Sequence, residues 1–493
     1  MTAGLTKQES QALTSQEAWL VASCAALIAA VVYAVTASTA PGFHDSAELA
    51  LRAGQLGATH APGAPLHTLL GHILTRIIGN PAVATVWLSV LSGALGVLLA
   101  TRIITVWSTD IWLPVAGGLA FAFVYPVWGN AVITELYALS VVCVATSIWL
   151  ALRWARAGYS GFPVAMTLVF AFSLAAHVAN ILLLPAFVWL FLARDGWRAR
   201  GLYLFLLASV VAVALIALAN VLLAARVLPF GQHAPASLDT LLLYMSGAEH
   251  DPLADKDLAG YLARIGEHAV IFSRHYLYIG LPLAAIGLYQ LCRIGPVFAG
   301  FLGLIFASYI GYFTLFGSGD YFVMVGPAYL ICSIWLALGA ATFTARLPIA
   351  QLTGVSAVLP GLFAAAALAS QIPARYAATF STTVIDYVEE SFATLPDNAV
   401  AVARWNEFTA LRYEQYVFGK RLDVDFLVPA ESERHYSHGT VSSYLDFIDV
   451  SICKRPVLTN KLTSAIEARY RVAEFPFSNN WKQLYPADDS NCD

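Results

Sequence analysis

The chain has 493 residues, of which 59% are hydrophobic and 12% charged, with a mean hydropathy of +0.68 and a formal net charge of −4. This composition excludes a soluble globular protein, because a soluble fold of this length cannot cover so many apolar side chains. The slightly acidic balance also excludes the basic surface of a nucleic-acid-binding protein. The sequence therefore predicts a polytopic α-helical membrane protein.

Eleven apolar runs are long enough to cross a membrane. The first begins near Trp19 without a basic segment or a clear cleavage site, so we expect a retained helix and not a signal peptide. A shorter run at 64–79 predicts either a twelfth span or a helix lying in the interface. The eleven runs cover residues 17–39, 82–106, 111–127, 134–153, 162–178, 179–193, 201–226, 267–291, 295–316, 321–344 and 350–370.

Arginines favour the interfacial interpretation of 64–79. If that run does not cross, the loops that carry seven of the arginines fall on the side of the N-terminus, and the positive-inside rule places them in the cytoplasm. The first loop and the C-terminal segment then lie on the opposite face. The runs 162–178 and 179–193 could instead form one broken helix, which would change the parity. The arginines concerned are Arg153, Arg156, Arg194, Arg198, Arg200, Arg293 and Arg346.

Polar residues return after about residue 370, so we expect a membrane domain at 1–370 and a small α/β domain at 371–493. Expected elements are helices near 381–394 and 406–419 and strands at 399–402, 423–427 and 456–459. No glycine-rich phosphate loop accompanies them. Whether Cys453 and Cys492 form a disulfide stays open. The chain has no CxxC pair and no HExxH, so its spacing predicts no metal site.

The first loop carries the most informative candidates. Asp45 and Glu48 are three residues apart, which places both carboxylates on one face of a helix, where one could act as a base. The same spacing is typical of a capping box, in which both residues only close the helix start. His60 then opens a rigid His-Ala-Pro-Gly-Ala-Pro turn. Carboxylates at a membrane surface are costly, which favours a functional role.

Later spans carry a second set of candidates at their outer ends. Arginines there suit a phosphate, whereas carboxylates and aromatic rings suit a hydroxyl-rich ligand. Each has a structural alternative, namely helix capping, snorkelling or pairing between helices. A lipid-linked sugar phosphate combines all the features that this set would bind. The candidates are Glu135, Tyr137, His177, Arg226, Arg274, His275, Asp320 and Tyr321.

These residues resemble the transmembrane protein 260-like family, once catalogued as domain of unknown function 2723, of the GT-C class. Its first outer loop typically has an Asp-Ser-x-Glu followed by His-x-Pro-Gly-x-Pro-Leu, and both are present here at 45–48 and 60–66. The chain departs from the family at Leu422, where some members have proline. Weaker landmarks are Glu135-Leu136-Tyr137, His177, Arg226, Asp320-Tyr321-Phe322 and the segments 395–399, 405–407, 413–416 and 421–424.

The resemblance implies a GT-C bundle of about eleven spans with a juxtamembrane helix in the first loop. It also implies an inverting membrane glycosyltransferase that uses a polyprenyl-phosphate sugar, with mannose one candidate, and a protein, lipid or glycan acceptor. Asp45 would be the catalytic base and Glu48 would support it. We expect no cofactor, although a divalent ion is not excluded, and a bacterial inner membrane with the soluble domain in the periplasm. The alternative is a transporter or assembly factor for a lipid-linked substrate.

Overall fold

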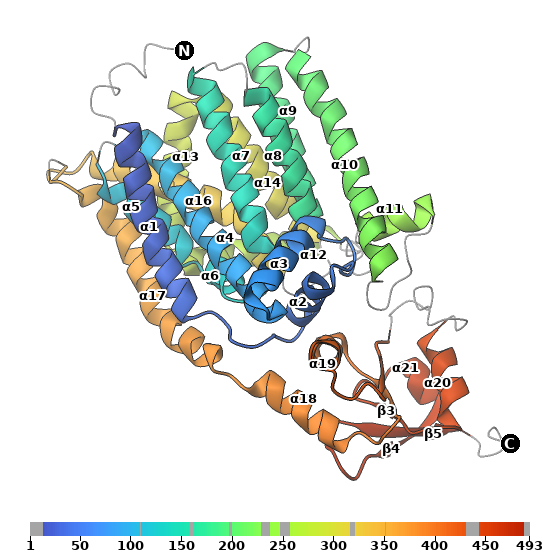
Figure 1. The fold of residues 1–493 in the computed structure, drawn as a ribbon. Coiled ribbons are helices and arrows are strands. Elements are labelled where there is room, and N and C mark those ends of the chain that lie inside the picture. Colours follow the sequence, from blue (N-terminus) through green and yellow to red (C-terminus); the bar gives the residue numbers. More distant parts are fainter. Residues whose placement is uncertain are drawn as a thin grey trace. The chain divides into compact units, whose positions relative to one another are not determined.

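The computed structural model describes residues 13–108, 110–157, 162–196, 200–227, 237–246, 257–315, 321–350, 352–429 and 443–487. Within these ranges the chain forms two compact units. The first contains the described residues of 1–37, 86–218 and 250–379, and the second those of 38–85, 219–249 and 380–493. Each unit is assembled from segments far apart in the sequence, as the colours in Figure 1 show.

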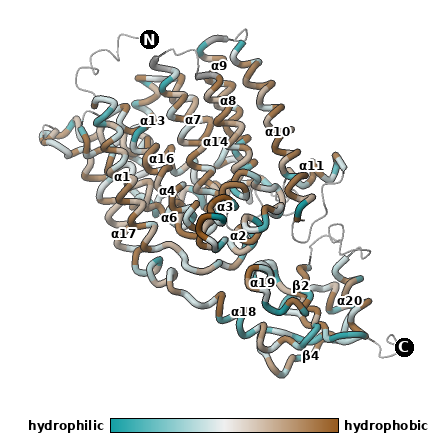
Figure 2. The backbone as a smooth tube through the Cα atoms, in the orientation of Figure 1, coloured by the Kyte–Doolittle hydropathy of each residue, from teal (hydrophilic) through white to brown (hydrophobic). Residues whose placement is uncertain are grey.

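The first unit is a bundle of apolar helices, mostly brown in Figure 2. Among the described residues, seven helices are long and apolar enough to cross a membrane, two bent helix pairs pass the same test, and two shorter apolar helices accompany them. These segments coincide with the eleven predicted runs, so the predicted polytopic helical architecture is confirmed. The helices are α1 (Ser15–Val35), α4 (Pro81–Ile104), η1 (Thr105–Trp107), α5 (Trp112–Ala122), α6 (Tyr125–Ala131), α7 (Tyr137–Ala157), α8 (Phe162–Ala176), η2 (Val178–Leu183), α9 (Leu184–Asp195), α10 (Arg200–Arg226), α12 (Leu258–His275), α13 (Gly280–Ile294), α14 (Pro296–Leu315), α15 (Tyr321–Met324), α16 (Gly326–Thr344), η3 (Val355–Ala357) and α17 (Val358–Thr379), with the start of α4 and the end of α10 belonging to the second unit.

Contacts at the helix ends fix the direction of the first spans. Arg102, near the end of α4, lies over the ring of Trp19, near the start of α1, at 5.4 Å. Helix α4 is therefore antiparallel to α1, which means that no span intervenes between them. Helix α3 (Pro65–Ile78) is only 14 residues long, and about 21 Å of helix falls short of a hydrocarbon core of about 30 Å. The interfacial interpretation of 64–79 agrees with both observations.

Helices α8 and α9 are two separate legs and not one broken helix. Arg194, at the end of α9, donates to the carbonyl of Trp154, at the end of α7, at 2.6 Å. Since α8 starts where α7 ends, α9 must return to the end from which α8 departed. The alternative of a single broken helix at 162–193 is wrong, and the predicted parity holds.

Three predicted runs are not straight helices. The run 111–127 bends by 73° between α5 and α6, where Pro126 occupies the first turn of α6. The run 267–291 bends by 101° between α12 and α13, and Leu277 and Tyr278 there have positive φ. The run 321–344 divides into α15 and α16, with Pro327 at the start of the second helix. Hydropathy does not predict these bends, because the side chains before and after each bend are equally apolar.

The second unit contains a five-stranded sheet of order β2-β1-β3-β5-β4, in which β1 is parallel to β2 and β3 and the remaining pairs are antiparallel. Successive residues of β1 alternate between two cores: Ala401 faces the core with α18 and α19, and Val400 and Val402 face the core with α20 and α21. The predicted C-terminal α/β domain is confirmed. The elements of the second unit are α2 (Asp45–Gln55), α3, α11 (Leu238–Ser246), α18 (Thr383–Thr394), β1 (Val400–Val402), α19 (Trp405–Phe418), β2 (Asp425–Leu427), α20 (Tyr444–Ile452), β3 (Val457–Thr459), α21 (Ser464–Arg469), β4 (Tyr470–Glu474) and β5 (Lys482–Pro486).

Helix α2 of the first loop packs on this domain, since Ala47, Ala50 and Leu51 belong to the same core as α18 and α19. The division at residue 370 stays a prediction from composition, and α17 continues to Thr379. Cys453 is disulfide-bonded, whereas Cys492 lies outside the described residues. Cys24, Cys143, Cys292 and Cys332 are free cysteines.

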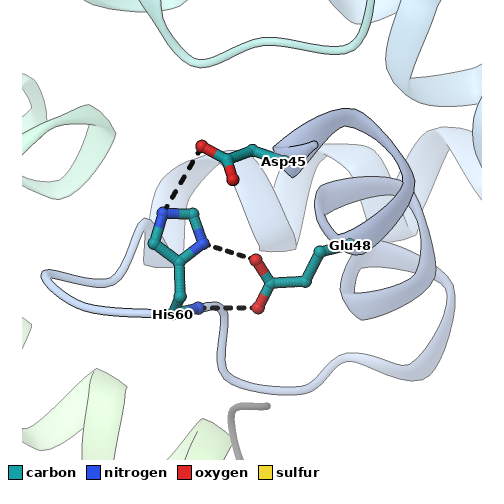
Figure 3. Close-up of side chains that lie close together, drawn as sticks. All are labelled: Asp45, Glu48 and His60. Atoms are coloured by element: carbon teal, nitrogen blue, oxygen red, sulfur yellow. Dashed lines mark hydrogen bonds and ion pairs between the residues drawn. The ribbon is translucent and has the colours of Figure 1, made fainter. Parts of the chain in front are cut away.

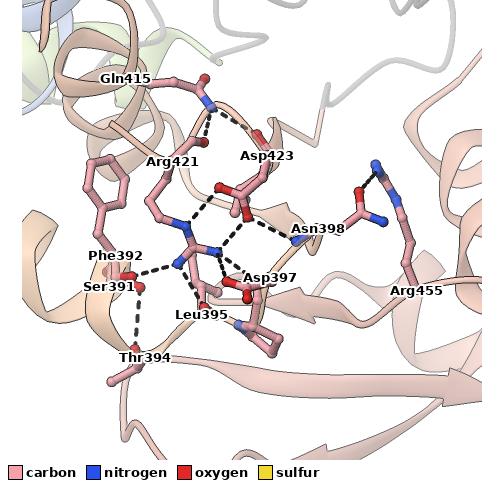
Figure 4. Close-up of polar contacts among 12 residues, drawn as sticks. Ser391, Phe392, Thr394, Leu395, Asp397, Asn398, Gln415, Arg421, Asp423 and Arg455 are labelled. Atoms are coloured by element: carbon pink, nitrogen blue, oxygen red, sulfur yellow. Dashed lines mark hydrogen bonds and ion pairs between the residues drawn. The ribbon is translucent and has the colours of Figure 1, made fainter. Parts of the chain in front are cut away.

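Arg421 explains two of the family landmarks as structural (Figure 4). Its guanidinium donates to the carbonyl of Phe392 in the last turn of α18 and to those of Leu395 and Pro396 just after it, at 2.6–2.8 Å. It also forms a bidentate pair with Asp423 at 2.9 and 3.0 Å. These bonds hold the pKa of the Asp423 carboxyl well below its usual range. The segments 395–399 and 421–424 therefore stabilise the C-terminal end of α18.

Candidate active site

The site is built at the start of α2. The helix begins at Asp45, and its N-cap is His44, which has a φ of +61° and makes no side-chain cap bond. Glu48 does not reach back to the helix start; its side chain is fully buried and turns toward His60. The capping-box interpretation is therefore wrong, because the partner of Glu48 is twelve residues away along the chain.

Asp45, Glu48 and His60 form one cluster in which hydrogen bonds join Glu48 to His60 and an ion-pair contact joins His60 to Asp45 (Figure 3). One oxygen of Glu48 accepts the backbone N–H of His60 at 2.8 Å, and the other pairs with Nδ1 of its ring. The second ring nitrogen, Nε2, lies 3.7 Å from Oδ2 of Asp45. The exposed side-chain fraction rises along this row, from 0% at Glu48 through 17% at His60 to 36% at Asp45. Asp45 is therefore the member that a substrate can reach.

The burial of Glu48 is compensated by positive charge. An isolated carboxylate inside a protein is costly unless donors and cations surround it. Arg52 follows one turn later on the same face of α2 and is 2% exposed. Burial lowers the pKa of Arg52 to about 10 and the attraction of Glu48 opposes that shift. Arg52 therefore stays charged at neutral pH and supports Glu48 together with His60.

The oxygens of Asp45 and Glu48 and the ring nitrogen of His60 that face one another lie within 4.8 Å, which is close enough for one metal ion to contact all three. In the structure Glu48 and His60 are hydrogen-bonded to each other, and Oδ2 of Asp45 faces Nε2 of His60 at 3.7 Å. The same three side chains thus allow two chemistries, a hydrogen-bonded acid–base group or a cation site.

Helix α19 holds the start of α2. The indole Nε1–H of Trp405 donates to Oδ1 of Asp45 at 2.8 Å, and the Trp405 ring meets the His60 ring edge to face at 5.6 Å. The hydroxyl of Thr409 donates to the carbonyl of His44 at 2.6 Å, and the N–H of His44 donates to the carbonyl of Asn406 at 3.4 Å. Residues of the C-terminal segment are thus part of the site.

The turn that carries His60 is pinned from α10 and α11. Tyr244 of α11 donates from its hydroxyl to the carbonyl of Thr59 at 2.7 Å. Gly63 has a φ of +81°, and a Cβ there would overlap Oδ1 of Asn220 and lie 2.8 Å from the Tyr244 hydroxyl. Only glycine satisfies both the backbone conformation and the space. The turn therefore places His60 against Glu48.

Gly63→Ala is expected to destabilise the protein by about 3 kcal/mol, of which about 1 comes from positive φ and the rest from overlap with Asn220 and Tyr244. Gly79→Ala is the matched control, because Gly79 has a φ of +89° and nothing within 4 Å of a Cβ. It should cost only about 1 kcal/mol. Urea midpoints of the two variants measure the difference, and equal losses would contradict the role of the Gly63 neighbours.

Most of the other predicted site residues belong to the first unit and have other partners. In the first unit the ring of Tyr137 packs on that of His177 at 5.5 Å, and Glu135 lies half-buried at the start of α7 with an oxygen 3.4 Å from the N–H of Leu136. Tyr321 donates to Glu267 at 2.8 Å, and His275 packs edge to face on Tyr329. Arg226 and Arg274 are exposed at helix ends. Asp320 lies outside the described residues.

Trp405, Tyr244, Asn220 and Arg52 contribute to the site or its support but were not predicted as site residues. Their positions in sequence carry no motif that links them to Asp45. The one available signal was the family landmark at 405–407. The sequence alone does not connect that landmark to the first loop.

Residues 45–200 match the family described as Protein O-mannosyl-transferase TMEM260 N-terminal domain. This part of the chain is similar to the N-terminal domain of the TMEM260 family. Over 130 residues the chain is 26% identical to Protein O-mannosyl-transferase tmem260 of Dictyostelium discoideum, an alignment that spans 26% of this chain and 16% of that protein. The matched segment begins at Asp45 and contains Glu48 and His60, whereas Trp405 lies outside it.

The fold of the chain resembles that of ArnT from Cupriavidus metallidurans. The crystal structure of ArnT bound to undecaprenyl phosphate has a TM-score of 0.60 at 13% identity and covers 95% of this chain and 98% of ArnT. Its apo structure has a TM-score of 0.58 at 14% identity, with 97% and 100% covered. The likeness extends over both units. The chain therefore has the GT-C-type fold of an integral membrane protein.

Proposed function

We propose that this chain is a membrane glycosyltransferase that moves a sugar from a polyprenyl-phosphate donor to a hydroxyl acceptor, with inversion at the sugar carbon. The Dictyostelium relative is named as a protein O-mannosyl-transferase, and ArnT was crystallised with undecaprenyl phosphate. Mannose is one candidate for the sugar. The observation that carries the proposal is the row Glu48–His60–Asp45, in which a buried carboxylate supports an exposed one.

Asp45 acts as the general base in this reaction. Its carboxylate takes the proton of the acceptor hydroxyl while the hydroxyl oxygen forms a bond to the sugar C1. The bond between C1 and the phosphate oxygen breaks, and its electron pair leaves with the polyprenyl phosphate. Glu48 has no exposure to substrate, so its part is to orient His60 and to stabilise positive charge on that ring.

The remaining candidates are proposed as contacts to substrate. Exposed guanidinium groups at Arg226 and Arg274 suit the phosphate. The hydroxyl-rich sugar and acceptor would meet carboxylates, imidazoles and aromatic rings at Glu135, Tyr137, His177, His275, Asp320 and Tyr321. The site would face the side opposite the cytoplasmic N-terminus, which for a bacterial inner membrane is the periplasm.

Incorporation of label from a panel of polyprenyl-phosphate sugars into membrane acceptors, by purified protein in liposomes, tests the proposal. Transfer with one donor supports it. Absence of transfer with every donor contradicts it, and movement of a lipid-linked substrate across the bilayer in the same liposomes would identify a transporter.

We expect transfer to need no metal ion, because hydrogen bonds to the backbone N–H and Nδ1 of His60 already occupy both oxygens of Glu48. Activity in excess EDTA should stay within about twofold of that without chelator. Loss in EDTA that Mg²⁺ or Mn²⁺ restores would contradict this expectation and assign a cation to Asp45, Glu48 and His60.

A further inference from the structure

We propose that Trp405, on helix α19 of the C-terminal segment, is a positioning residue for the Asp45 carboxylate, so that the C-terminal segment completes the active site. The inference rests on the proposed function and adds a residue outside the matched segment 45–200. Trp405 is 360 residues from Asp45 in sequence, and both belong to the second compact unit.

The two oxygens of Asp45 face different partners. Oδ1 accepts the indole N–H at 2.8 Å, while Oδ2 points toward His60 Nε2 at 3.7 Å. A hydrogen bond to a charged acceptor is stronger than one between neutral groups, and the indole nitrogen can only donate. Trp405 therefore fixes the rotation of the carboxylate and determines which oxygen is directed at the imidazole.

The position of Trp405 is itself well defined. The ring packs on Phe408 at 6.2 Å and on His60 at 5.6 Å, from the side of α19 and of the first loop respectively. The start of α19 is further joined to the start of α2 through Thr409 and the backbone of Asn406. An indole packed against two rings loses little freedom when it donates, so the bond to Asp45 is preorganised.

Trp405 could act on Asp45 through the packing of its ring or through its hydrogen bond. Three variants distinguish these two roles. Trp405→Phe keeps an aromatic ring and removes the N–H. Trp405→Gln removes the ring but keeps an N–H at the same number of bonds from Cβ. Trp481→Phe is the control, because Trp481 is fully buried in the same unit and donates its indole N–H to Ser391, away from Asp45.

In the transfer assay, Trp405→Phe should lower kcat about tenfold, the loss of about 1.4 kcal/mol expected for a bond to a charged group, with KM for the donor unchanged. Trp405→Gln should recover part of that loss. Trp481→Phe should keep the wild-type kcat. Wild-type kcat in Trp405→Phe, or an equal loss in the two Trp→Phe variants, would overturn the proposal.

A second measurement does not depend on activity. In full-length protein with ¹⁵N-labelled tryptophan in nanodiscs, the indole signal absent from Trp405→Phe belongs to Trp405. Asp45→Asn should shift that signal upfield, because its acceptor becomes a neutral amide, and should leave the Trp481 signal in place. An unshifted Trp405 signal would overturn the proposal even where transfer is measured. A shifted signal with no transfer from any donor would retain the positioning of Asp45 and contradict the proposed function alone.

Discussion

Replacing Asp45 with asparagine is expected to lower transfer by about 10³-fold, because the variant keeps the shape of the side chain and loses its capacity to take a proton. The amide oxygen of asparagine can still accept the Trp405 N–H. Folding and donor affinity should therefore be retained. The measurement is the initial rate of sugar transfer in liposomes, together with the thermal unfolding midpoint of each variant.

The control for this experiment is Asp397→Asn, since the Asp397 side chain is fully exposed in the same unit and lies outside the site. It removes one carboxylate without touching Asp45, and its rate should equal that of the wild type. A rate for Asp45→Asn within tenfold of the wild type would place the base elsewhere. Collapse of the unfolding midpoint would instead show that Asp45 is needed for folding.

Arg421→Ala is expected to destabilise the C-terminal α/β domain by about 3 kcal/mol. The guanidinium is 18% exposed, and its removal leaves the carbonyls of Phe392, Leu395 and Pro396 without this donor. Asp423 also loses the partner that keeps its pKa low. A urea midpoint for the full chain, followed by limited proteolysis of the domain, measures the loss.

Lys482→Ala provides the comparison, because it removes a cation from an ion pair of the same domain. The Lys482–Glu474 pair is solvent-exposed, with side chains 39% and 79% exposed. Exposed pairs contribute little, so this variant should lose less than about 0.5 kcal/mol. Similar losses in Arg421→Ala and Lys482→Ala would contradict the view that Arg421 closes the end of α18.

Local sequence predicted the membrane spans because the bilayer imposes a local rule: a spanning backbone must satisfy its hydrogen bonds within one helix of about 20 apolar residues. Local sequence also predicted the strands at Val400–Val402 and Val457–Thr459, because these are short apolar runs between polar turns. The sequence did not predict the bends at α5–α6 and α12–α13, because a bend in an apolar segment depends on packing that hydropathy does not record.

The candidate site was predicted in part. Asp45, Glu48 and His60 stand close in sequence, and the Pro/Gly turn between 60 and 65 marked the loop as constrained. Their roles were not decided there, because Asp-x-x-Glu spacing fits a capping box as well as a pair of functional carboxylates. The structure separated the two by the burial of Glu48 and its bonds to His60.

The sequence by itself determined a polytopic helical protein, a small α/β domain near its C-terminus and a first loop rich in chemistry, since each of these follows from composition or from spacing within a few residues. Only the tertiary structure decided that Glu48 supports His60, that Arg421 ties off α18 and that Trp405 reaches Asp45. Those contacts join residues from 12 to 360 positions apart, and the distant contact arises when helices α2 and α19 bury their apolar faces in one core.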